Sequence, residues 1–153
     1  MNAHEVLTEQ HRDIDSLYTE FLAATGEVKA GLAKQILTNL TVHAEIEEEL
    51  YYPEMEKAGL KNLEGEFEAE HTAMKSLITK LTIMDTNEVD YEPTMKALME
   101  NVRHHVEEEE TQSMPKMEAL VNADVLRTLG PKLEARTKEL KESTIKRLWA
   151  VVT

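Results

Sequence analysis

The sequence predicts an all-α protein: an up-down-up-down antiparallel four-helix bundle with an additional C-terminal helix. Apolar residues recur with alternating gaps of three and four along four long segments, which is the period of an amphipathic helix. The chain has five glycines and four prolines, and they gather near the expected helix boundaries. The loops left between the segments are short, and short loops make consecutive helices antiparallel neighbours in a bundle.

The first helix is expected over about residues 3–24, and Gly26 ends it. Its inward stripe consists of Leu7, His11, Ile14, Tyr18 and Phe21. The second helix is expected over about residues 28–52, and Pro53 stops it because proline lacks the N–H that continues a helix. Its inward stripe consists of Ile36, Leu40, His43, Glu47 and Leu50.

The third helix is expected over about residues 62–84, and residues 85–88 break its pattern. Its stripe consists of Phe67, His71, Met74, Ile78 and Leu81. The fourth helix begins near Pro93, since proline is favoured in a first turn, and Pro115 stops it at about residue 113. Its stripe consists of Met95, Leu98, Val102, His105, Glu109 and Gln112.

A fifth helical segment is expected over about residues 123–147, interrupted by Gly130 and Pro131. We expect residues 1–122 to form the bundle and residues 123–153 to form a helical extension that packs on it, all within one domain. The extension is mildly basic, with seven basic and four acidic side chains in residues 124–153. It is therefore expected to lie as a solvated cap on the acidic bundle.

Composition excludes several classes of protein. The net charge of −13 argues against a nucleic-acid partner, because phosphate binding needs clustered Lys and Arg. The chain has no cysteine, which excludes disulfides, iron–sulfur clusters and thiolate metal sites. No apolar run approaches the roughly 20 residues that span a bilayer, and no signal peptide is visible at the N-terminus. These features predict a cytoplasmic protein without a membrane partner.

The polar residues of the stripes belong to an internal repeat. Residues 7–21 align with residues 67–81 at an offset of 60, and residues 36–53 align with residues 98–115 at an offset of 62. The chain thus contains two similar helix pairs, and each pair carries a histidine followed by a His-x-x-x-Glu motif. The matched polar residues are His11 with His71, Asn39 with Asn101, His43 with His105, and Glu47 with Glu109.

These histidines and glutamates predict a metal centre. Residues i and i+4 of a helix lie on one face about 6 Å apart, so each His-x-x-x-Glu pair points into the bundle. Such groups buried without partners cost several kcal/mol each, and bound cations are the simplest compensation. Six nitrogen and oxygen ligands exceed what one tetrahedral zinc needs and favour two octahedral metals. The expected ligands are His11, His43, Glu47, His71, His105 and Glu109.

Two other histidines compete with this assignment. His104 with Glu108 forms an alternative His-x-x-x-Glu register, which the alignment of Pro53 with Pro115 disfavours. His4 lies on the same face as His11, seven residues earlier, and is expected at the surface or behind the ligands. Asn39 and Asn101 stand one turn before the motif histidines and are candidates to hydrogen-bond the ligands or the neighbouring helices.

Residues 3–115 resemble the hemerythrin-like (HHE cation-binding) family. The resemblance rests on His11, His43-Ala-Glu-Ile-Glu47, His71 and His105-Val-Glu-Glu-Glu109, and Glu49-Leu-Tyr-Tyr-Pro53 is similar to the segment that closes the second helix in many bacterial members, mycobacterial ones included. It implies an oxo- or hydroxo-bridged pair of iron ions, with manganese or zinc less favoured. The four histidines would be terminal ligands, and Glu47 and Glu109 bridging or near-bridging carboxylates.

The sequence departs from the oxygen-carrying hemerythrins at the third helix. Those proteins have a second histidine one turn after the third-helix ligand, where this chain has Lys75. Their last motif is His-x-x-x-x-Asp instead of His-x-x-x-Glu. A missing ligand leaves a coordination position open to water or a substrate, which suits reactive chemistry more than oxygen carriage.

Two consecutive tyrosines follow the second-helix motif. Tyr51 stands four residues after Glu47, so a helical wheel places it beside the metals, while the direction of Tyr52 before Pro53 is not predictable. Either phenol can bind iron or donate a hydrogen bond at the site. The alternative is that the two tyrosines close the end of the bundle.

Three functions follow from a di-iron centre with an open position. The leading hypothesis is an oxidoreductase that disproportionates hydrogen peroxide like a non-haem catalase, in defence against oxidative stress. The second is reversible binding or sensing of O2 or NO. The third is iron storage or donation for the repair of iron–sulfur clusters. The expected partners are small molecules, and the sequence identifies no electron donor.

Overall fold

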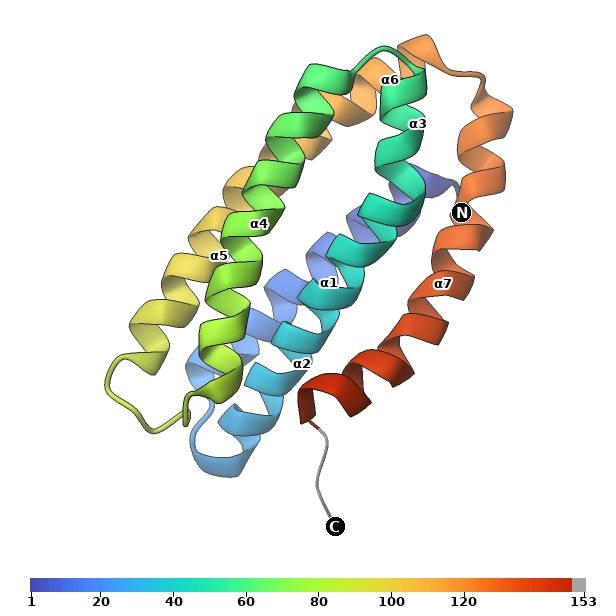
Figure 1. The fold of residues 1–153 in the computed structure, drawn as a ribbon. Helices are drawn as coiled ribbons and strands as arrows, with labels where there is room; N and C mark the ends of the chain where they lie inside the picture. Colours follow the sequence, from blue (N-terminus) through green and yellow to red (C-terminus); the bar gives the residue numbers. More distant parts are fainter. Residues whose placement is uncertain (150–153) are drawn as a thin grey trace.

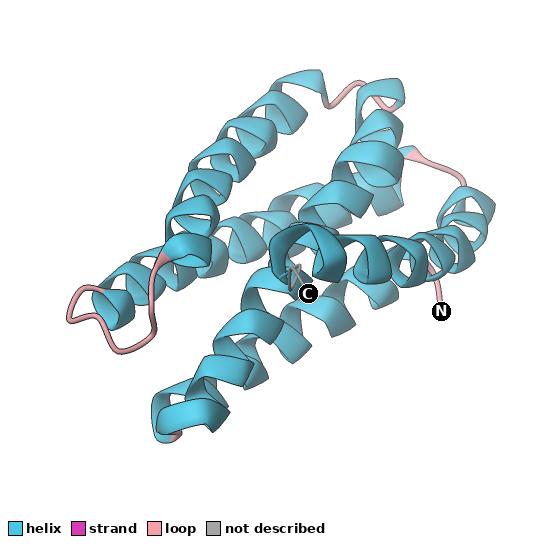
Figure 2. Cartoon of the chain, turned by 60° about the horizontal axis from the view of Figure 1, so that its bottom comes forward, coloured by secondary structure: helices cyan, strands magenta, loops and turns pink. Residues whose placement is uncertain are grey.

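The computed structural model describes residues 1–149 of the chain as a bundle of four long antiparallel helical rods with a fifth helix along one side (Figure 1). The described residues form only helices and the loops between them (Figure 2), which confirms the predicted all-α class. The rods are α1 (Ala3–Ala23), then α2 (Gly26–Ile46) with η1 (Glu47–Tyr51) and α3 (Tyr52–Lys57), then α4 (Lys61–Ile83), and finally α5 (Tyr91–Glu108) with η2 (Glu109–Ser113) and α6 (Met114–Leu120).

The ends of the first rod show why the helices begin and turn where they do. Asn2 and Glu5 form a capping box at the start of α1: the Asn2 side chain accepts from the Glu5 backbone N–H at 2.9 Å, and Glu5 accepts from the Asn2 N–H at 3.1 Å. The turn into α2 uses Gly26 at φ 60°, a backbone conformation that glycine adopts without strain. The two-residue connection makes α1 and α2 antiparallel neighbours.

Two predicted helix ends are wrong, because the second and fourth rods run through Pro53 and Pro115. In each rod a five-residue π-helical turn, η1 or η2, precedes the proline. The turn widens the hydrogen-bond ladder by one residue, and each proline then falls in the first turn of the next α-helix. A missing N–H is tolerated there, so the rods continue to Lys57 and Leu120.

The predicted interruption of the fifth segment is also absent. Helix α7 (Ala123–Trp149) is continuous and contains Pro131. The glycine before it has a packing role: a side chain at Gly130 would overlap the carbonyl oxygen of Met1. Helix α7 packs against α1 and α2, and Arg136 and Arg147 pair with Glu49 and Glu45 at 2.8 and 2.9 Å. Residues 150–153 of the predicted extension lie outside the described residues, and its boundary at residue 123 stays a prediction.

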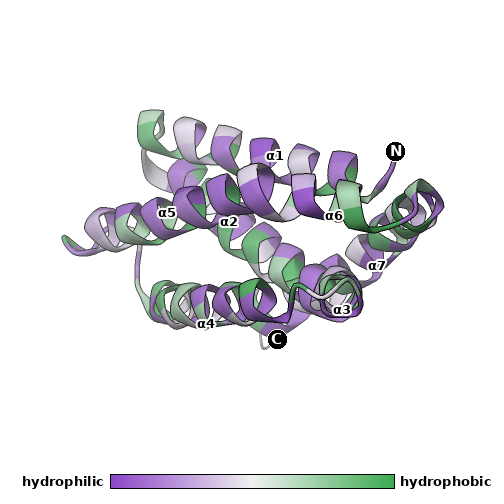
Figure 3. Cartoon of the chain, turned by 90° about the horizontal axis from the view of Figure 1, so that it is seen from above, coloured by the Kyte–Doolittle hydropathy of each residue, from purple (hydrophilic) through white to green (hydrophobic). Residues whose placement is uncertain are grey.

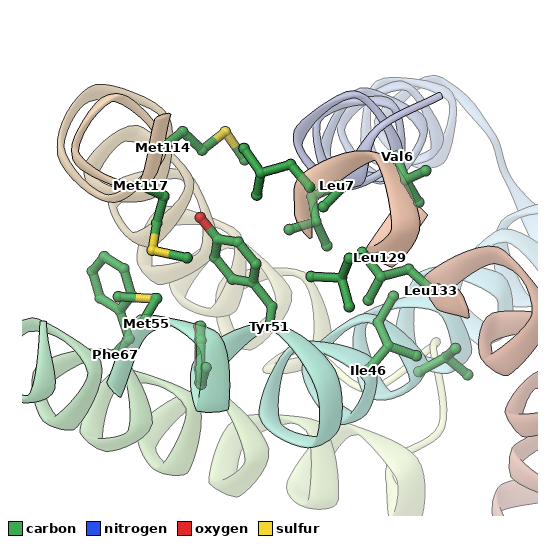
Figure 4. Close-up of a cluster of buried hydrophobic side chains, with 14 of the residues drawn as sticks. Val6, Leu7, Ile46, Tyr51, Met55, Phe67, Met114, Met117, Leu129 and Leu133 are labelled. Carbon is green, nitrogen blue, oxygen red and sulfur yellow. The ribbon is translucent and has the colours of Figure 1, made fainter. Parts of the chain in front are cut away.

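The core consists of two apolar clusters separated along the bundle. One contains Tyr51, Tyr52, Met55, Phe67 and their neighbours near the N-terminal half of α1, part of which is shown in Figure 4. The other fills the opposite half and contains Ile14, Phe21, Ile36, Leu81, Met95 and their neighbours. Hydrophobic and hydrophilic residues are interspersed within the helices (Figure 3), as expected for helices with one buried face. Within residues 1–149, no helix is long and apolar enough to cross a membrane.

Candidate metal centre

The six predicted ligands meet in a polar layer between the two apolar clusters. In the first, third and fourth rods the site residues stand between members of the two clusters, as His11 does between Leu7 and Ile14. All six side chains are buried, and Glu47 and Glu109 are completely inaccessible to solvent. Their ligand atoms form two groups whose members lie within 4.8 Å of one another, each of which could hold a metal ion: His11, His43, Glu47 and Glu109 in one, and Glu47, His71 and His105 in the other.

The two halves of the chain meet at this layer with the symmetry that the repeat predicts. The Nε2 atoms of His11 and His43 are 3.1 Å apart, and so are those of His71 and His105. Each carboxylate reaches one histidine of each half. Glu47 Oε1 lies 3.3 Å from His43 Nε2 and 3.2 Å from His71 Nε2. Glu109 lies 3.1 Å from His11 Nε2 and 3.3 Å from His105 Nε2.

Two oxygen atoms of the site lack a hydrogen-bond partner. Glu47 Oε2 and Glu109 Oε1 are buried and accept no hydrogen bond from the described residues. A buried carboxylate oxygen without a partner costs free energy that a cation removes. Imidazole nitrogens about 3 Å apart, with carboxylates between the pairs, are the donors that first-row transition metals prefer. The donor set therefore fits two cations.

In the metal-free protein, the two carboxylates stabilise the protonated form of the neighbouring histidines. Burial favours the neutral ring of His11, but the carboxylate of Glu109, 3.1 Å from the ring, and the charge of Glu47 raise its pKa to about 9. The same balance raises the pKa of His105 to about 11. Burial opposes ionisation of Glu47, yet the charge of His43 and hydrogen bonds within the layer keep the pKa of this carboxyl well below its ordinary value. Metal ions therefore have to displace protons from these rings.

The outer ring nitrogens are held by a second layer of side chains. His43 Nδ1 donates to Gln10 at 2.7 Å and His105 Nδ1 to Glu70 at 2.6 Å. His71 Nδ1 donates to Glu48 at 2.8 Å and His11 Nδ1 to Glu110 at 2.7 Å. These bonds fix the ring orientation and direct each Nε2 into the site.

The internal repeat could have predicted the residues that hydrogen-bond the outer ring nitrogens. Gln10 corresponds to Glu70 at the offset of 60, and Glu48 to Glu110 at the offset of 62. Each is the direct neighbour of a site residue in the sequence. Asn39 and Asn101, the other candidates, make no side-chain hydrogen bond to a site histidine among the described residues.

Tyr52, whose direction the sequence did not predict, lies at the ligands, whereas Tyr51, which a helical wheel places there, does not. The Tyr52 hydroxyl lies inside the ligand cluster, 3.0 Å from His71 Nε2, 3.1 Å from His105 Nε2 and 3.0 Å from Glu109 Oε2. The hydroxyl of Tyr51 instead bonds His4 and Ser113, at 2.9 and 3.0 Å. The wheel fails because η1 adds one residue to the turn after Glu47.

His4 is buried instead of lying at the surface, and its side chain bonds Tyr51 and Glu118 and not one of the six expected ligands. Its Nε2 contacts the Tyr51 hydroxyl, and its Nδ1 donates to Glu118 at 3.0 Å. Figure 4 shows the Tyr51 ring beside Leu7, Met114 and Met117, with its hydroxyl directed towards α6. His4, Tyr51 and Ser113 thus tie α1 to the second and fourth rods beside the metal layer.

Residues 2–117 match the hemerythrin HHE cation-binding domain family. The chain belongs to this family. Protein Rv2633c of Mycobacterium tuberculosis is 28% identical over 148 residues, which are 95% of this chain and 91% of that protein. The crystal structure of a hemerythrin HHE cation-binding domain-containing protein from Mycobacterium kansasii, a homolog of Rv2633c, superposes with a TM-score of 0.85 at 28% identity and covers 98% of this chain and 93% of that one.

Two other relatives match over only part of their own length. A protein of Nostoc sp. named DNA nickase is 28% identical over 112 residues, 72% of this chain, and the chain spans 32% of the Nostoc protein. A hemerythrin-like protein of Schizosaccharomyces pombe is 26% identical over 118 residues, 74% of this chain and 58% of that protein. This chain is thus a hemerythrin-like metal-binding domain.

The hemerythrin-like site has a small cavity on the side away from Tyr52. The cavity has a volume of about 30 Å³ and is lined by all four site histidines, by apolar side chains and by Lys75. Such a volume holds one or two molecules of the size of water. Lys75, which replaces a histidine of the oxygen carriers, pairs with Glu48 at 2.7 Å. Only a small molecule can therefore approach the histidines from this cavity.

Proposed function

We propose that this hemerythrin-like domain binds two iron ions and disproportionates hydrogen peroxide. The expected ligands are the four histidines with Glu47 and Glu109, which span the two halves of the site as bridging carboxylates do. An imidazole-rich set of nitrogen and oxygen donors favours iron over manganese. When bound, the iron pair supplies reversible redox chemistry, which allows two peroxide molecules to yield two water molecules and one O2.

Lys75 is the observation that supports peroxide as the substrate. The cavity beside the histidines admits two or three heavy atoms, and Lys75 is the one ammonium group among its lining residues. Hydrogen peroxide is polar and accepts hydrogen bonds, whereas O2 and NO do not need a donor. Lys75 can donate to a peroxide oxygen in the cavity, while its pairing with Glu48 links it to the outer face of His71.

Disproportionation also requires that protons move between two peroxide molecules. The Tyr52 hydroxyl donates to Glu109 at 3.0 Å and to Glu47 at 3.3 Å, so these carboxylates are placed to accept its proton when a bound cation favours the phenolate. Burial of the ring, together with the charges of Glu109 and Glu47, raises the pKa of Tyr52 and keeps this proton in place in the metal-free protein.

An oxygen electrode tests this proposal. Iron-loaded protein is expected to release one O2 for every two molecules of peroxide consumed, and His43→Ala, which removes a ligand, should abolish the reaction. Lys75→Met should lower kcat/KM severalfold while the iron content stays unchanged. Lys80→Met, an exposed position on the same helix that does not line the cavity, is the matched control. The proposal fails if iron-loaded wild-type protein releases no oxygen, or if His43→Ala releases as much.

The apolar walls of the cavity favour a second function, reversible binding of O2 or NO. Ile14, Leu40, Met74, Ile78 and Val102 line most of the space next to the histidines, and apolar gases partition into such spaces. Titration of the reduced protein with each gas, followed through the visible spectrum, measures this binding. Recovery of the starting spectrum under vacuum, without consumption of the gas, would identify a binding protein instead of an enzyme.

A further inference from the structure

The second histidine of the pair His104-His105 faces the opposite way from the first. His105 is buried in the metal layer, whereas the side chain of His104 is 70% exposed at the surface of α5. Each has a glutamate four residues later: Glu109 for His105 and Glu108 for His104. His104 Nε2 lies 2.9 Å from Glu108 Oε1, so the side chains of this outward-facing His-x-x-x-Glu motif are in contact.

Glu70 of α4 completes an outer cluster with this pair. Its Oε2 lies 3.9 Å from His104 Nε2. Glu70, His104 and Glu108 each offer one ligand atom, and these three atoms lie within 4.8 Å of one another. The three residues come from two rods, and the exposed ring of His104 leaves the cluster open to solvent.

An oxygen of the outer cluster lacks a partner in the same way as those of the inner site. Glu108 Oε1 is buried and accepts no hydrogen bond, although His104 Nε2 is only 2.9 Å away. The ring and the carboxylate are thus close without the alignment of a hydrogen bond. Of the four buried side-chain atoms without partners in residues 1–149, three are carboxylate oxygens of His-x-x-x-Glu glutamates: Glu47 Oε2, Glu109 Oε1 and Glu108 Oε1.

We propose that Glu70, His104 and Glu108 form an outer site for one divalent transition-metal cation, separate from the inner pair. One imidazole and two carboxylates suit Mn²⁺, Fe²⁺, Co²⁺ or Zn²⁺, with water in the remaining positions. A cation here provides a partner for Glu108 Oε1 and reduces the repulsion between the carboxylates of Glu70 and Glu108. The net charge of −13 concentrates cations near this surface.

Glu70 joins the outer site to the inner one. Its Oε1 accepts from His105 Nδ1 at 2.6 Å, while its Oε2 faces His104. A cation held by Glu70 draws negative charge away from that hydrogen bond and makes His105 a weaker donor to an inner metal. This coupling rests on the proposed function, because it requires a metal bound by His105. The outer site itself does not.

Manganese titration of the iron-loaded protein tests the outer site. The EPR signal of free aqueous Mn²⁺ decreases as the ion binds, and one Mn²⁺ per chain is expected to bind without loss of iron. His104→Ala and Glu108→Gln should weaken this binding at least tenfold. Glu107→Gln removes the same charge from an exposed neighbour outside the cluster and should change it less than twofold.

The outcomes distinguish Mn²⁺ binding at the outer site from non-specific attraction of Mn²⁺ to the acidic surface and from binding at the inner centre. Equal Mn²⁺ binding by wild type and His104→Ala, or equal losses in Glu107→Gln and Glu108→Gln, would overturn the outer site. Absence of Mn²⁺ binding at pH 7 would overturn it as well. The iron content of each variant reports the inner centre independently. A shift of the iron absorption spectrum on adding Mn²⁺ to wild type but not to His104→Ala would support the coupling, and no shift would overturn the coupling alone.

Discussion

The backbone N–H of Tyr52 donates to the carbonyl oxygen of Glu47, five residues earlier instead of four. The additional residue in this turn brings the phenol of Tyr52, and not that of Tyr51, over the carboxylate of Glu47. Met114 and Glu109 have the same relationship in the second half of the chain. The two halves therefore have the same backbone conformation here but differ in side-chain chemistry. Met114 occupies in the second half the position that Tyr52 occupies in the first.

The Tyr52 hydroxyl lies among the expected ligands, so Tyr52 is itself predicted to bind the metal. Burial and the charges of Glu109 and Glu47 raise the pKa of the phenol and keep its proton in place, and a nearby cation reverses that preference. Iron-loaded protein is expected to show a visible phenolate-to-iron charge-transfer band that Tyr52→Phe loses and Tyr51→Phe retains. Absorption spectra of the three proteins at equal iron content measure this. A band that persists in Tyr52→Phe would assign it to another group.

His4 is predicted to stabilise the fold without holding metal. His4→Ala removes one of the two buried partners of the Tyr51 hydroxyl, leaving Ser113, and creates a cavity at the start of α1. The lost hydrogen bond together with the lost packing costs about 2–4 kcal/mol. Urea denaturation should show this loss in the free energy of unfolding while the iron content stays at the wild-type value. A fall in iron content at full folding would place His4 among the ligands.

Glu47→Gln is expected to change the metal-free and the metal-loaded protein in opposite directions. The substitution removes a buried charge, so the metal-free protein should be equally or more stable. It also removes an oxygen shared by the two halves, so the gain in stability on adding iron should fall, because that gain depends on metal affinity. Thermal unfolding with and without iron measures both effects. Glu66→Gln, at an exposed position of α4 outside the site, is the control.

The stability of the metal-free protein is predicted to depend on pH through the site histidines. The pKa values of His11 and His105 are raised to about 9 and about 11, so their stabilisation is complete below the ordinary histidine value of 6.5. It declines as pH rises through 9 and then towards 11. The pKa of Glu47 is lowered, so its stabilisation is present above the ordinary value of 4.5 and is lost as pH falls.

Denaturation of the metal-free protein between pH 5 and 10 tests this dependence. A decrease in the free energy of unfolding above about pH 6.5 is expected, with a smaller decrease in His11→Gln. The iron-loaded protein should not show it, because the metal replaces the protons on the rings. A metal-free protein as stable at pH 9 as at pH 6 would contradict the raised pKa values.

The sequence alone was enough to place the bundle and its polar layer. The period of the stripes determined the four rods, because a helix must bury one face. The repeat determined which side chains meet, because two similar halves pack with approximate two-fold symmetry. It also distinguished His105 with Glu109 from His104 with Glu108. Family membership followed from the same histidines and glutamates and is confirmed by the match over residues 2–117.

Only the tertiary structure decided what surrounds that layer. The π-helical turns before Pro53 and Pro115 shift the register by one residue, and a wheel of constant pitch cannot include them. Tyr52 therefore entered the site in place of Tyr51. The role of Glu70, between His105 and His104, depends on the distance between α4 and α5. Periodicity determines which face of a helix is buried, whereas contacts between faces depend on how the helices pack.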